Sequence, residues 1–561
     1  MPDPHSPRSR PWLPTALVFL LAPPLVLWPM PLVGLRALLT MPQGEGAGHL
    51  WALYAALREG SPLFFHTDLI CFPGGVDTLL IDPANLPFFA LGSLLGPAAA
   101  YNAILLGGLL LMGLAGALLA RCVGGEAWLG ALAAMACPSF LAGAIRGATE
   151  QLAVAWVGIA IALLLLALRR GGGWRIALAA LAMGACAWGG PYNGVWVAAA
   201  GLAVGVGAMI RTPRLALGRA LPVGLGAALV AAPVAWGVLA HFAVMNDPRF
   251  ANPGPQQILG RFRYARGGNI GFADLLDPWV PSPFTGPYSE LSQTTYLGIV
   301  LILAAVAALV VRRQLWPWVL GALAASAVAL GPWIYLDGQL LSIGDHALAG
   351  PALALSKLPF LGSMTHWYRA APVAGLLLAA VVSTWGARRW SPLLAVAILA
   401  DALLLAPFAW PHNAFAPPAL GAAAAMQGPG AVLELPSTTQ SDPPKGAWRN
   451  VGGLHQLAHG RPVSSTVMRL SSDTPSPVNE PSLHALQRSG ALRAAERQDL
   501  LDAGFRWLVV YPDYRPRQAP SLEIEPLEHC LGEPVFLAED AWVFDLDLTA
   551  GQDCQPTSRT R

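Results

Sequence analysis

The feature that most constrains this chain is a series of long apolar runs. From Trp12 to Trp410 about eleven such runs follow one another, separated by short polar breaks. Each has roughly the length of about 20 residues that a helix needs to cross the hydrocarbon core of a bilayer. The runs lie near 12–34, 98–120, 127–145, 152–168, 174–190, 194–210, 220–241, 294–311, 315–335, 371–387 and 391–411. The pattern predicts a polytopic α-helical membrane protein with about 11 transmembrane helices.

The composition supports this class and excludes others. Hydrophobic residues make up 55% of the chain and charged residues only 12%, whereas a soluble domain carries about 25% charged residues. The net charge of +2 is close to balance, so no nucleic-acid partner is expected. Two arginines precede the first run, as in a signal peptide, but the run is too long for the apolar core of one, and we treat it as a span.

The charges between the runs predict the orientation. Alternate breaks carry arginines, namely Arg8, Arg10, Arg121, Arg169, Arg170, Arg175, Arg211, Arg214, Arg219, Arg312, Arg313, Arg388 and Arg389. The other breaks carry most of the acids, namely Glu45, Asp68, Asp77, Asp82, Glu150, Asp247, Asp274, Asp277, Glu290, Asp337 and Asp345. Because arginine and lysine are enriched in cytoplasmic loops, we expect a cytoplasmic N-terminus. An odd number of spans then places the C-terminal part outside the cytoplasm.

The chain divides into two predicted domains. Residues 1–411 form the multi-span domain, with large outer loops near 40–97, 242–293 and 336–370, and residues 412–561 form a soluble extracytoplasmic α/β domain. In the second domain, strands are predicted at AVLELP, FRWLVVYP and AWVFDLDL, and a helix is predicted over 481–504, capped near Ser482 and stopped by Gly504. Cys530 and Cys554 fall there too, either as a disulfide or as two buried thiols.

Several motifs of the outer loops and the C-terminal part resemble a known family. They are GEGAGHLW after the first run, TDLICFPGGVD with its predicted tight turn, GPAAAYNAILL, LPFLGSMTHWYRAAP, and VLELP with HGRPV. In this order they resemble bacterial membrane glycosyltransferases of the GT-C fold class, of the type that uses polyprenyl-phosphate sugars. The resemblance covers most of the chain. It implies a GT-C-like fold in the bacterial inner (plasma) membrane.

The resemblance implies a catalytic acid, and Glu45 is the candidate. In an inverting transfer, one carboxylate accepts the proton of the attacking hydroxyl group while a lipid phosphate leaves. The alternative for Glu45 is an acid that stabilises a helix start. His49, four residues on, would share its helix face and contact the sugar, or serve in an amphipathic interfacial helix. Asp68 and Asp82 of the same loop are further substrate-binding candidates, and only a loose divalent-cation site could be formed from them with Glu45.

The leaving group is anionic, so a basic site on the outer side is expected. We predict that Arg369 binds the phosphate, with His366 beside it and Arg249 of another outer loop as a further contact. Tyr192 and Asn193 in GGPYNGVW are candidates for hydrogen bonds to the sugar, although the same residues are typical of an ordinary turn. Basic residues near Arg249 also fit contacts to anionic headgroups.

Two further charges lie in apolar surroundings. Arg146 and Glu150 are four residues apart near an outer helix end, where they form an ion pair with each other or line the cavity. Asp401 lies well inside the last run, where a charge is costly and usually faces a partner. We expect a structural role for Asp401 near the interior of the bundle.

The function predicted from the sequence is transfer of a sugar from a polyprenyl-phosphate-linked donor to a glycan, lipid or protein acceptor outside the cytoplasm. One alternative is a polytopic transporter or lipid-linked glycan flippase, but no internal repeat is seen. Another is a catalytically inactive GT-C-like assembly protein, which stays open because the family usually has Asp where this chain has Glu45. No P-loop, dinucleotide-binding or zinc-protease motif occurs, and no cofactor is certain.

Overall fold

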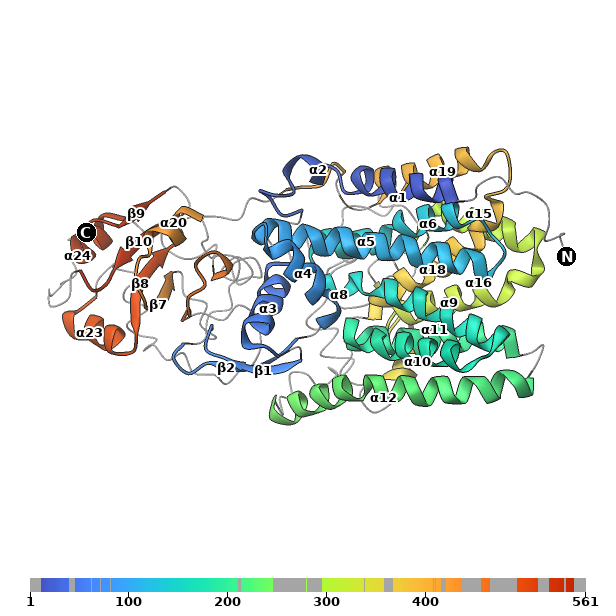
Figure 1. The fold of residues 1–561 in the computed structure, drawn as a ribbon, viewed down its shortest axis with the longest axis horizontal. Helices are drawn as coiled ribbons and strands as arrows, with labels where there is room; N and C mark the ends of the chain where they lie inside the picture. Colours follow the sequence, from blue (N-terminus) through green and yellow to red (C-terminus); the bar gives the residue numbers. More distant parts are fainter. Residues whose placement is uncertain are drawn as a thin grey trace.

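The computed structural model describes most of the helical bundle and parts of the C-terminal domain. The described residues are 12–39, 46–61, 63–70, 72–80, 82–209, 213–245, 279, 295–336, 339–357, 367–406, 408, 410–414, 420–435, 456–464, 492–512, 524–538 and 541–548. For some of these inside helices and strands, among them His49 and Arg146, only the backbone is described. The helices run side by side in one bundle, and the strands of the C-terminal domain lie beyond one end of it (Figure 1).

Each of the eleven predicted apolar runs contains a helix. The helices are α1 (Trp12–Val26), α5 (Pro97–Cys122), α6 (Ala127–Met135) with α7 (Pro138–Arg146), α9 (Val154–Arg170), α10 (Gly173–Ala185), α11 (Pro191–Met209), α12 (Pro213–Met245), α15 (Ile299–Val311), α16 (Trp316–Ala329), α18 (Ala371–Val382) and α19 (Ser391–Ala400). The agreement follows from the length of the runs, since buried or lipid-facing backbone must satisfy its own hydrogen bonds.

Fewer helices than eleven have the full length of a span. Among the described residues, four helical stretches are long and apolar enough to cross a membrane: Pro97–Cys122, Thr149–Arg170, Leu217–Leu239 and Trp367–Trp385. The pair α6 and α7, bent by 46°, is a fifth if it counts as one span. The remaining apolar helices are shorter. The fold is therefore that of a polytopic helical membrane protein, and the count of eleven stays a prediction.

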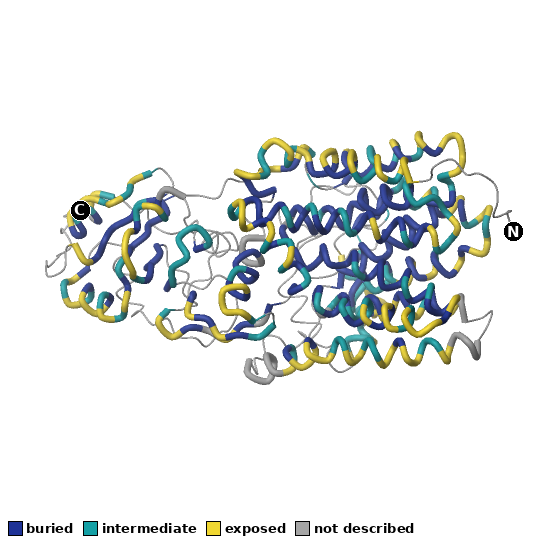
Figure 2. The backbone as a smooth tube through the Cα atoms, viewed as in Figure 1, coloured by how far each residue is buried: buried dark blue, intermediate teal, exposed yellow. Residues whose placement is uncertain are grey.

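The stretch around α18 lies at the centre of the bundle, and α12 lies at its rim. The apolar window of Trp367–Trp385 is wholly buried, whereas that of Leu217–Leu239 is 17% buried. Figure 2 shows the same contrast between the dark interior and the exposed outer helices. An exposed apolar face such as that of α12 is suited to contact with lipid.

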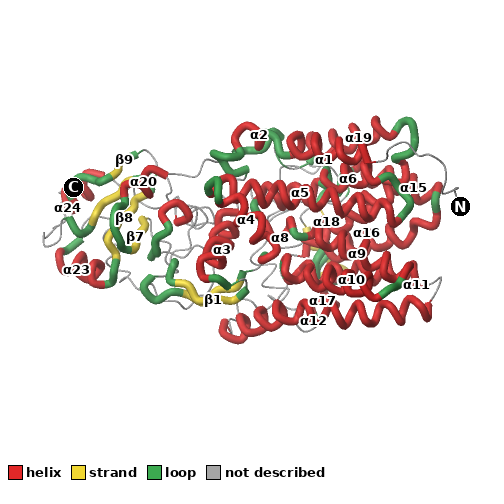
Figure 3. Tube along the Cα trace, viewed as in Figure 1, coloured by secondary structure: helices red, strands yellow, loops and turns green. Residues whose placement is uncertain are grey.

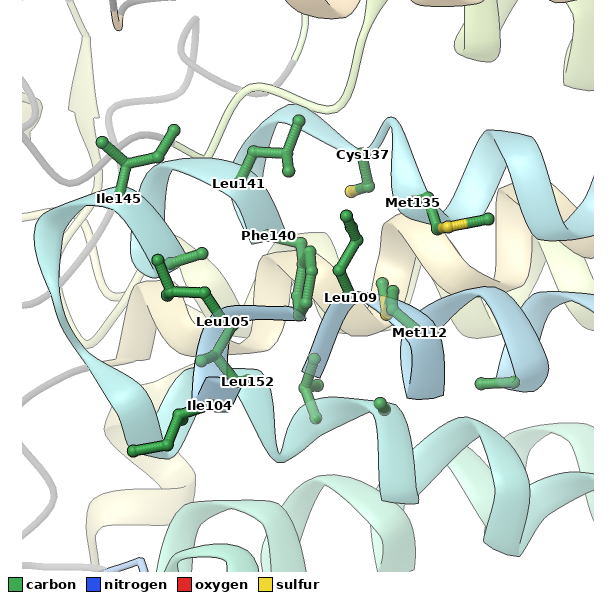
Figure 4. Packing of buried hydrophobic residues seen from close by; sticks show 14 of the residues in the cluster. Ile104, Leu105, Leu109, Met112, Met135, Cys137, Phe140, Leu141, Ile145 and Leu152 are labelled. Atoms are coloured by element: carbon green, nitrogen blue, oxygen red, sulfur yellow. The ribbon is translucent and has the colours of Figure 1, made fainter. Parts of the chain in front are cut away.

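Small residues allow the central helices to approach closely. A Cβ atom added to Gly116 of α5 would overlap the carbonyl oxygen of Gly130 in α6. Figure 4 shows apolar side chains packed between α5 and α7, with Phe140 of α7 beside Leu105 and Leu109 of α5. Such small-residue contacts are typical of helix packing in membranes, where dispersion rather than water exclusion holds helices together.

Arginines gather at one end of the bundle. Arg169 donates a hydrogen bond to the carbonyl oxygen of Cys122 at 2.8 Å, at the C-terminal end of α5. Arg219 donates to the carbonyl oxygen of Leu168 at 2.7 Å, near the C-terminal end of α9. Guanidinium groups satisfy the last carbonyl groups of a helix and complement its dipole. Both arginines belong to breaks that the sequence predicts to be arginine-bearing, and the orientation of these ends stays a prediction.

Asp401 has the structural role expected of it. It begins a π-helical turn, Asp401–Leu405, that continues α19. Its carboxylate accepts a hydrogen bond from the hydroxyl group of Tyr296 at 2.6 Å and another from the backbone N–H of Val300 at 2.8 Å. Since Val300 lies in the first turn of α15, Asp401 satisfies the start of a neighbouring helix.

The first outer loop contains regular elements. They are α3 (Gly46–Glu59), β1 (Phe64–Thr67), β2 (Val76–Leu79), η1 (Pro83–Asn85) and α4 (Leu86–Ser93), preceded by α2 (Met30–Val33). β1 and β2 pair in an antiparallel hairpin. The predicted tight turn FPGGVD connects them, and Gly75 has a φ of +66°, which a side chain would rarely adopt. A Cβ atom there would also lie 2.6 Å from Nε2 of His66.

Short elements also lie between α16 and α18. They are β3 (Tyr335–Leu336) paired with β4 (Gln339–Leu340), β5 (Ser342–Ile343) paired with β6 (His346–Ala347), and α17 (Pro351–Ser356). Single turns of helix, η2 (Cys186–Gly189), η4 (Arg313–Leu315), η5 (Trp367–Ala370) and η6 (Ser383–Trp385), adjoin the longer helices.

The C-terminal domain is built on a four-stranded sheet in the order β7-β8-β10-β9 (Figure 3). All three predicted strands are present, as β7 (Ala431–Leu435), β8 (Phe505–Val510) and β10 (Trp542–Asp545), with a short β9 (Phe536–Leu537) at the edge. β7 and β8 are parallel, and β10 is antiparallel to β8. The helices of the domain are α20 (Leu420–Ala425), α23 (Ala494–Asp502) and α24 (Ile524–Leu531), so α/β is the correct class.

The helix predicted over 481–504 is not continuous over its described residues. Residues 492 and 493 are not helical, and α23 begins at Ala494 with Arg493 as its N-cap. The side chain of Glu496 accepts a hydrogen bond from the backbone N–H of Arg493 at 3.1 Å, which defines this start. Gly504, with a φ of +92°, follows the helix as predicted. Ser482 lies outside the described residues.

Cys530 is disulfide-bonded. Cys122, Cys137 and Cys186 are free. Cys554 lies outside the described residues, so its pairing with Cys530 stays a prediction.

Candidate functional site

A buried polar cluster lies where the first outer loop meets the helices of the bundle. Its centre is α8 (Thr149–Leu152), a single turn between α7 and α9. Four segments distant in sequence contribute polar side chains to it. We call it the α8 cluster, and its members are Asp82, Asn85, Thr149, Glu150, Gln151, Tyr192, Asn193, Tyr368 and Arg369.

Glycines allow α8 to lie within the bundle. Gly147, with a φ of +92°, ends α7 in a left-handed conformation and redirects the chain into α8. A Cβ atom on Gly108 of α5 would come within 2.7 Å of the Cβ atom of Leu152, and one on Gly143 would overlap the side chain of Gln151. Figure 4 shows Leu152 among the apolar side chains near Ile104 and Leu105. The apolar end of α8 is therefore packed, and its three polar residues are presented to their partners.

Asp82 anchors the outer loop to α8. Its side chain is fully buried, and its Oδ2 atom accepts hydrogen bonds from the hydroxyl group of Thr149 and, at 3.2 Å, from Nδ2 of Asn85. Asn85 also donates to the carbonyl oxygen of Thr149 at 2.9 Å. A buried carboxylate requires such donors, and here they join η1 to α8.

Glu150 and Arg369 form a buried ion pair. Nη2 of Arg369 contacts Oε1 of Glu150, and the two side chains are only 9% and 4% exposed. The guanidinium carbon of Arg369 also lies 5.1 Å from the ring centre of Tyr192 and 5.9 Å from that of Tyr368. Because breaking one partner of a buried pair costs about 3–5 kcal/mol, this contact fixes η5, just before α18, against α8.

Two amides complete the cluster. Nε2 of Gln151 donates to the hydroxyl group of Tyr368 at 2.8 Å. Nδ2 of Asn193 donates to the carbonyl oxygens of Glu150 at 3.2 Å and Gly189 at 2.8 Å. Three consecutive residues, Thr149 to Gln151, thus contact the outer loop, η5 and its arginine.

Four of the predicted site residues come together in this cluster: Asp82, Tyr192, Asn193 and Arg369. Tyr192 and Asn193 occupy the first turn of α11, so the ordinary-turn alternative is wrong for them. Glu150 pairs with Arg369, a partner that the sequence analysis did not propose. Sequence reasoning also missed Asn85, Thr149, Gln151 and Tyr368, although three adjacent polar residues within apolar sequence were a usable signal.

The other predicted site residues lie elsewhere or outside the described residues. Glu45, Arg249 and His366 are not among the described residues, and of His49 only its place on α3 is given. Asp68 lies next to the exposed hairpin, where its carboxylate is 3.2 Å from Nε2 of His66. Asp68 has no recorded contact with the α8 cluster, so the contacts of the described residues do not bring it to Arg369.

His66 lies between two carboxylates. Its Nδ1 atom is 3.1 Å from Oδ1 of Asp77, and Asp68 lies on the other side of the ring. The hydrogen bond to Asp77 is the main reason that the pKa of His66 is raised, with a smaller contribution from Asp68. Within the described part of the chain, no group of three or more histidine, cysteine or acidic side chains could hold a metal ion. The divalent cation stays an untested prediction.

Comparison with known proteins finds similarity only among solved structures. No protein-family model and no curated protein matches the sequence. A mutant of the arabinofuranosyltransferase AftD from Mycobacteria is similar over 98% of this chain, with 15% identity and a TM-score of 0.49. The oligosaccharyltransferase of Archaeoglobus fulgidus in its apo form is similar over 90% of this chain and 70% of its own, with 12% identity and a TM-score of 0.47.

These similarities concern the course of the chain alone. This chain spans 42% of the length of the arabinofuranosyltransferase. With identities below 25% and TM-scores below 0.5, the likeness transfers no residue role and no activity.

Proposed function

We propose that this protein is a membrane glycosyltransferase that takes a sugar from a polyprenyl-phosphate carrier and transfers it to a glycan, lipid or protein outside the cytoplasm. The observation that carries the proposal is the α8 cluster, in which Arg369 is held among Tyr192, Tyr368 and Glu150. This cluster joins the first outer loop to the central helix of the bundle. A membrane enzyme acting on a lipid-linked donor needs its site where outer loops meet spans.

The transfer requires one base and one site for the leaving phosphate. As the acceptor oxygen bonds to the anomeric carbon, its proton passes to a carboxylate, and the bond from that carbon to the phosphate oxygen breaks with both electrons leaving on phosphate. Glu45, directly before α3, is the proposed base. Arg369 is the proposed phosphate contact, since guanidinium binds phosphate through paired N–H groups.

The ion pair with Glu150 has a place in this scheme. A guanidinium group as buried as that of Arg369 requires a counter-charge when no phosphate is bound. Glu150 supplies it, and the rings of Tyr192 and Tyr368 restrict the plane of the group. We assign Asp82 a positioning role, because its hydrogen bonds to Thr149 and Asn85 tie the outer loop to α8.

The donor class is tested by binding of undecaprenyl phosphate to the purified protein in nanodiscs, followed by native mass spectrometry. Arg369→Gln should weaken binding by roughly 10-fold or more, because one charge-assisted contact contributes about 1.5–3 kcal/mol. Arg493→Gln, at an exposed pair of α23, is the matched control and should bind as the wild type does. Unchanged binding in Arg369→Gln would contradict the role of Arg369, and no binding by the wild type would contradict the donor class.

Catalysis is tested with a panel of undecaprenyl-phosphate-linked sugars. Glu45→Gln should keep undecaprenyl phosphate binding and lower turnover roughly 10²-fold or more, because general base catalysis contributes about 10²–10⁴. Full activity in this variant would contradict the assignment of Glu45 as the base. A wild type that binds the lipid but never transfers a sugar would favour the inactive assembly protein.

A transporter or flippase would be expected to use charges deep within its spans. Asp401, which lies deep within a predicted span, gives this alternative no support. Asp401 is bound by Tyr296 and by the start of α15, as a structural residue would be. Movement of an undecaprenyl-linked sugar across a liposome membrane, without any change in its chemistry, is the result that would favour this alternative.

A further inference from the structure

The C-terminal domain is tied to the first outer loop through one buried amide. Gln456 is fully buried, and its side chain contacts three separate segments. Its Oε1 atom accepts a hydrogen bond from Nε1 of Trp51 in α3 at 2.5 Å. Its Nε2 atom donates to the carbonyl oxygen of Leu69 in the outer loop and, at 2.8 Å, to that of Arg461.

The backbone around Gln456 continues the sheet of the C-terminal domain into the outer loop. Val432 of β7 donates to the carbonyl oxygen of Pro462 at 2.8 Å, and Ser464 donates to that of Val432 at 3.1 Å. On the other side, Val463 donates to the carbonyl oxygen of Leu69 at 2.9 Å, and Phe72 donates to that of Val463 at 3.1 Å. Residues 462–464 therefore lie like a strand between β7 and the loop, covering an edge of the sheet.

We call the contacts of residues 456–464 with α3 and the first outer loop the joint, and two more contacts hold it. Nη1 of Arg58, in the last turn of α3, donates to the carbonyl oxygen of Gly460 at 2.5 Å. The rings of Phe72 and Phe505 meet edge to face, with their centres 5.4 Å apart. Polar and apolar contacts thus connect the second and last turns of α3 and the hairpin turn to the C-terminal domain.

We infer that Gln456 is a positioning residue, through which the C-terminal domain fixes the place of α3 relative to the α8 cluster. The helix it holds begins directly after Glu45 and carries His49, and the loop it holds continues to Asp82. This inference rests on the proposed function for the identity of the reaction. The contact with α3 itself does not depend on that function.

The chemistry of the amide makes the inference specific. One end of the side chain faces an N–H donor and the other end faces two carbonyl oxygens, so only an amide in this orientation satisfies all three. Gln456→Glu keeps the size of the side chain. It replaces the NH₂ group that donates to two carbonyl oxygens with an oxygen atom that accepts hydrogen bonds. Trp51→Phe removes only the single indole donor. The glutamate variant should therefore loosen the joint more than the phenylalanine variant does.

The test is hydrogen exchange of the full-length protein in detergent, read by mass spectrometry. In Gln456→Glu, exchange of peptides over 46–59 and 63–80 should accelerate roughly tenfold or more, because each unsatisfied buried group favours local opening. Peptides over β8 and β10 should exchange as in the wild type. Trp51→Phe should give a smaller increase in the same peptides. Gln498→Glu, on the exposed side of α23, is the matched control and should change neither region.

The transfer assay adds a readout that loss of packing alone would not give. Gln456→Glu should lower kcat while undecaprenyl phosphate binding stays within about twofold of the wild type, because Arg369 is not in the joint. Unchanged exchange over 46–59 would overturn the inference, and so would equal acceleration over the whole C-terminal domain. A wild type that fails to bind undecaprenyl phosphate would overturn the proposed function, while the exchange data would still decide whether Gln456 holds α3.

Discussion

At the scale of single residues, the α8 cluster places two opposite charges where neither would be stable alone. Glu150 and Arg369 are both nearly inaccessible to solvent, and their contact joins α8 to η5. A buried pair of this kind contributes little net stability compared with an apolar replacement, but removal of one partner leaves an uncompensated charge. The pair therefore specifies which segments meet more than it strengthens the fold.

This arrangement predicts a non-additive pair of substitutions. Glu150→Gln and Arg369→Gln should each lower the free energy of unfolding by about 3–5 kcal/mol, because each leaves the other charge buried. The double variant should lose less than the sum of the two. Thermal midpoints in one detergent measure the effect, with Asp499→Asn, at an exposed position of α23, as a control that should shift little. Additive losses would show that the two charges do not interact.

A second prediction at this scale concerns pH and the β1–β2 hairpin. Hydrogen bonds to Asp77 and Asp68 raise the pKa of His66 in the folded protein. Because the pKa is higher in the folded protein, protonated His66 stabilises the hairpin. The contribution is complete when the pH is below the unfolded pKa of about 6.5, and it is lost as the pH rises through the higher pKa of the folded protein. Exchange of the peptide over 63–80, corrected for intrinsic rates, should thus show more protection at pH 5.5 than at pH 9.

The histidine variant separates this effect from general pH dependence. His66→Gln should make the protection of the hairpin nearly independent of pH in this range, whereas His346→Gln, on β6, should leave the wild-type profile unchanged. Equal pH profiles for His66→Gln and the wild type would assign the dependence to other groups.

The residue types of the site were more predictable than their partners. Arg369 could be selected because a positive residue on the outer side opposes the positive-inside bias. Tyr192 and Asn193 could be selected because their hydrogen-bonding groups were expected to face outward. The contacts of these residues could not be predicted, because Glu150 and Arg369 are brought together only by the packing of α8 against η5. The i+4 spacing of Arg146 and Glu150 favoured a local pair instead, and local spacing cannot show a competing partner distant in sequence.

At the scale of elements, α8 depends on glycines in the helices around it. The Cβ atom of Leu152 would lie only 2.7 Å from a Cβ atom placed on Gly108. Because this neighbour is close to the backbone, a methyl group at Gly108 would have to displace α8 rather than rotate a side chain. The close approach of α8 to Gly108 of α5 thus sets the apolar contact of Leu152 and the polar contacts of Thr149 to Gln151.

We predict that Gly108→Ala disturbs the site through α8. Overpacking of this kind costs about 1–3 kcal/mol, and the displaced α8 should also weaken undecaprenyl phosphate binding. Gly224→Ala in α12, where a Cβ atom would meet nothing within 4 Å, is the matched control and should change neither stability nor binding. Wild-type binding in Gly108→Ala would show that the cluster tolerates movement of α8.

The sequence predicted the helices better than the breaks between them. Long apolar runs require internal hydrogen bonding in a membrane, so each run contains a helix. The bend between α6 and α7 was absorbed into one predicted run, 127–145, because hydropathy does not register a change of direction within apolar sequence. The single turn of α8 lies almost wholly in the break after that run, where no helix was predicted. For α23, helix-forming residues before Arg493 favoured an earlier start, and the contact of Glu496 with Arg493 sets the later one.

At the scale of the whole molecule, the arginines that bind helix ends and the α8 cluster lie at opposite ends of the bundle. Arg169 and Arg219 bind helix ends at one end, while Asp82, Glu150 and Arg369 meet at the other, toward the sheet of the C-terminal domain (Figure 1). The segments that follow α1 and α19 also meet, since the backbone N–H of His412 donates to the carbonyl oxygen of Trp28 at 2.9 Å. This contact fits the prediction that the first and last spans run in the same direction, as an odd number of spans requires.

This arrangement predicts a topology that fusion proteins can test. Arginine-rich ends remain in the cytoplasm, so the α8 cluster, α3 and the C-terminal domain should all lie outside it. Alkaline phosphatase, which is active only after export, should be active when fused after Arg561 and inactive when fused after Arg313. A fluorescent protein that matures only in the cytoplasm should give the opposite result at both positions. An inactive phosphatase after Arg561 would place the C-terminal domain inside, away from any lipid-linked sugar on the outer face, and would contradict the orientation on which the proposed reaction depends.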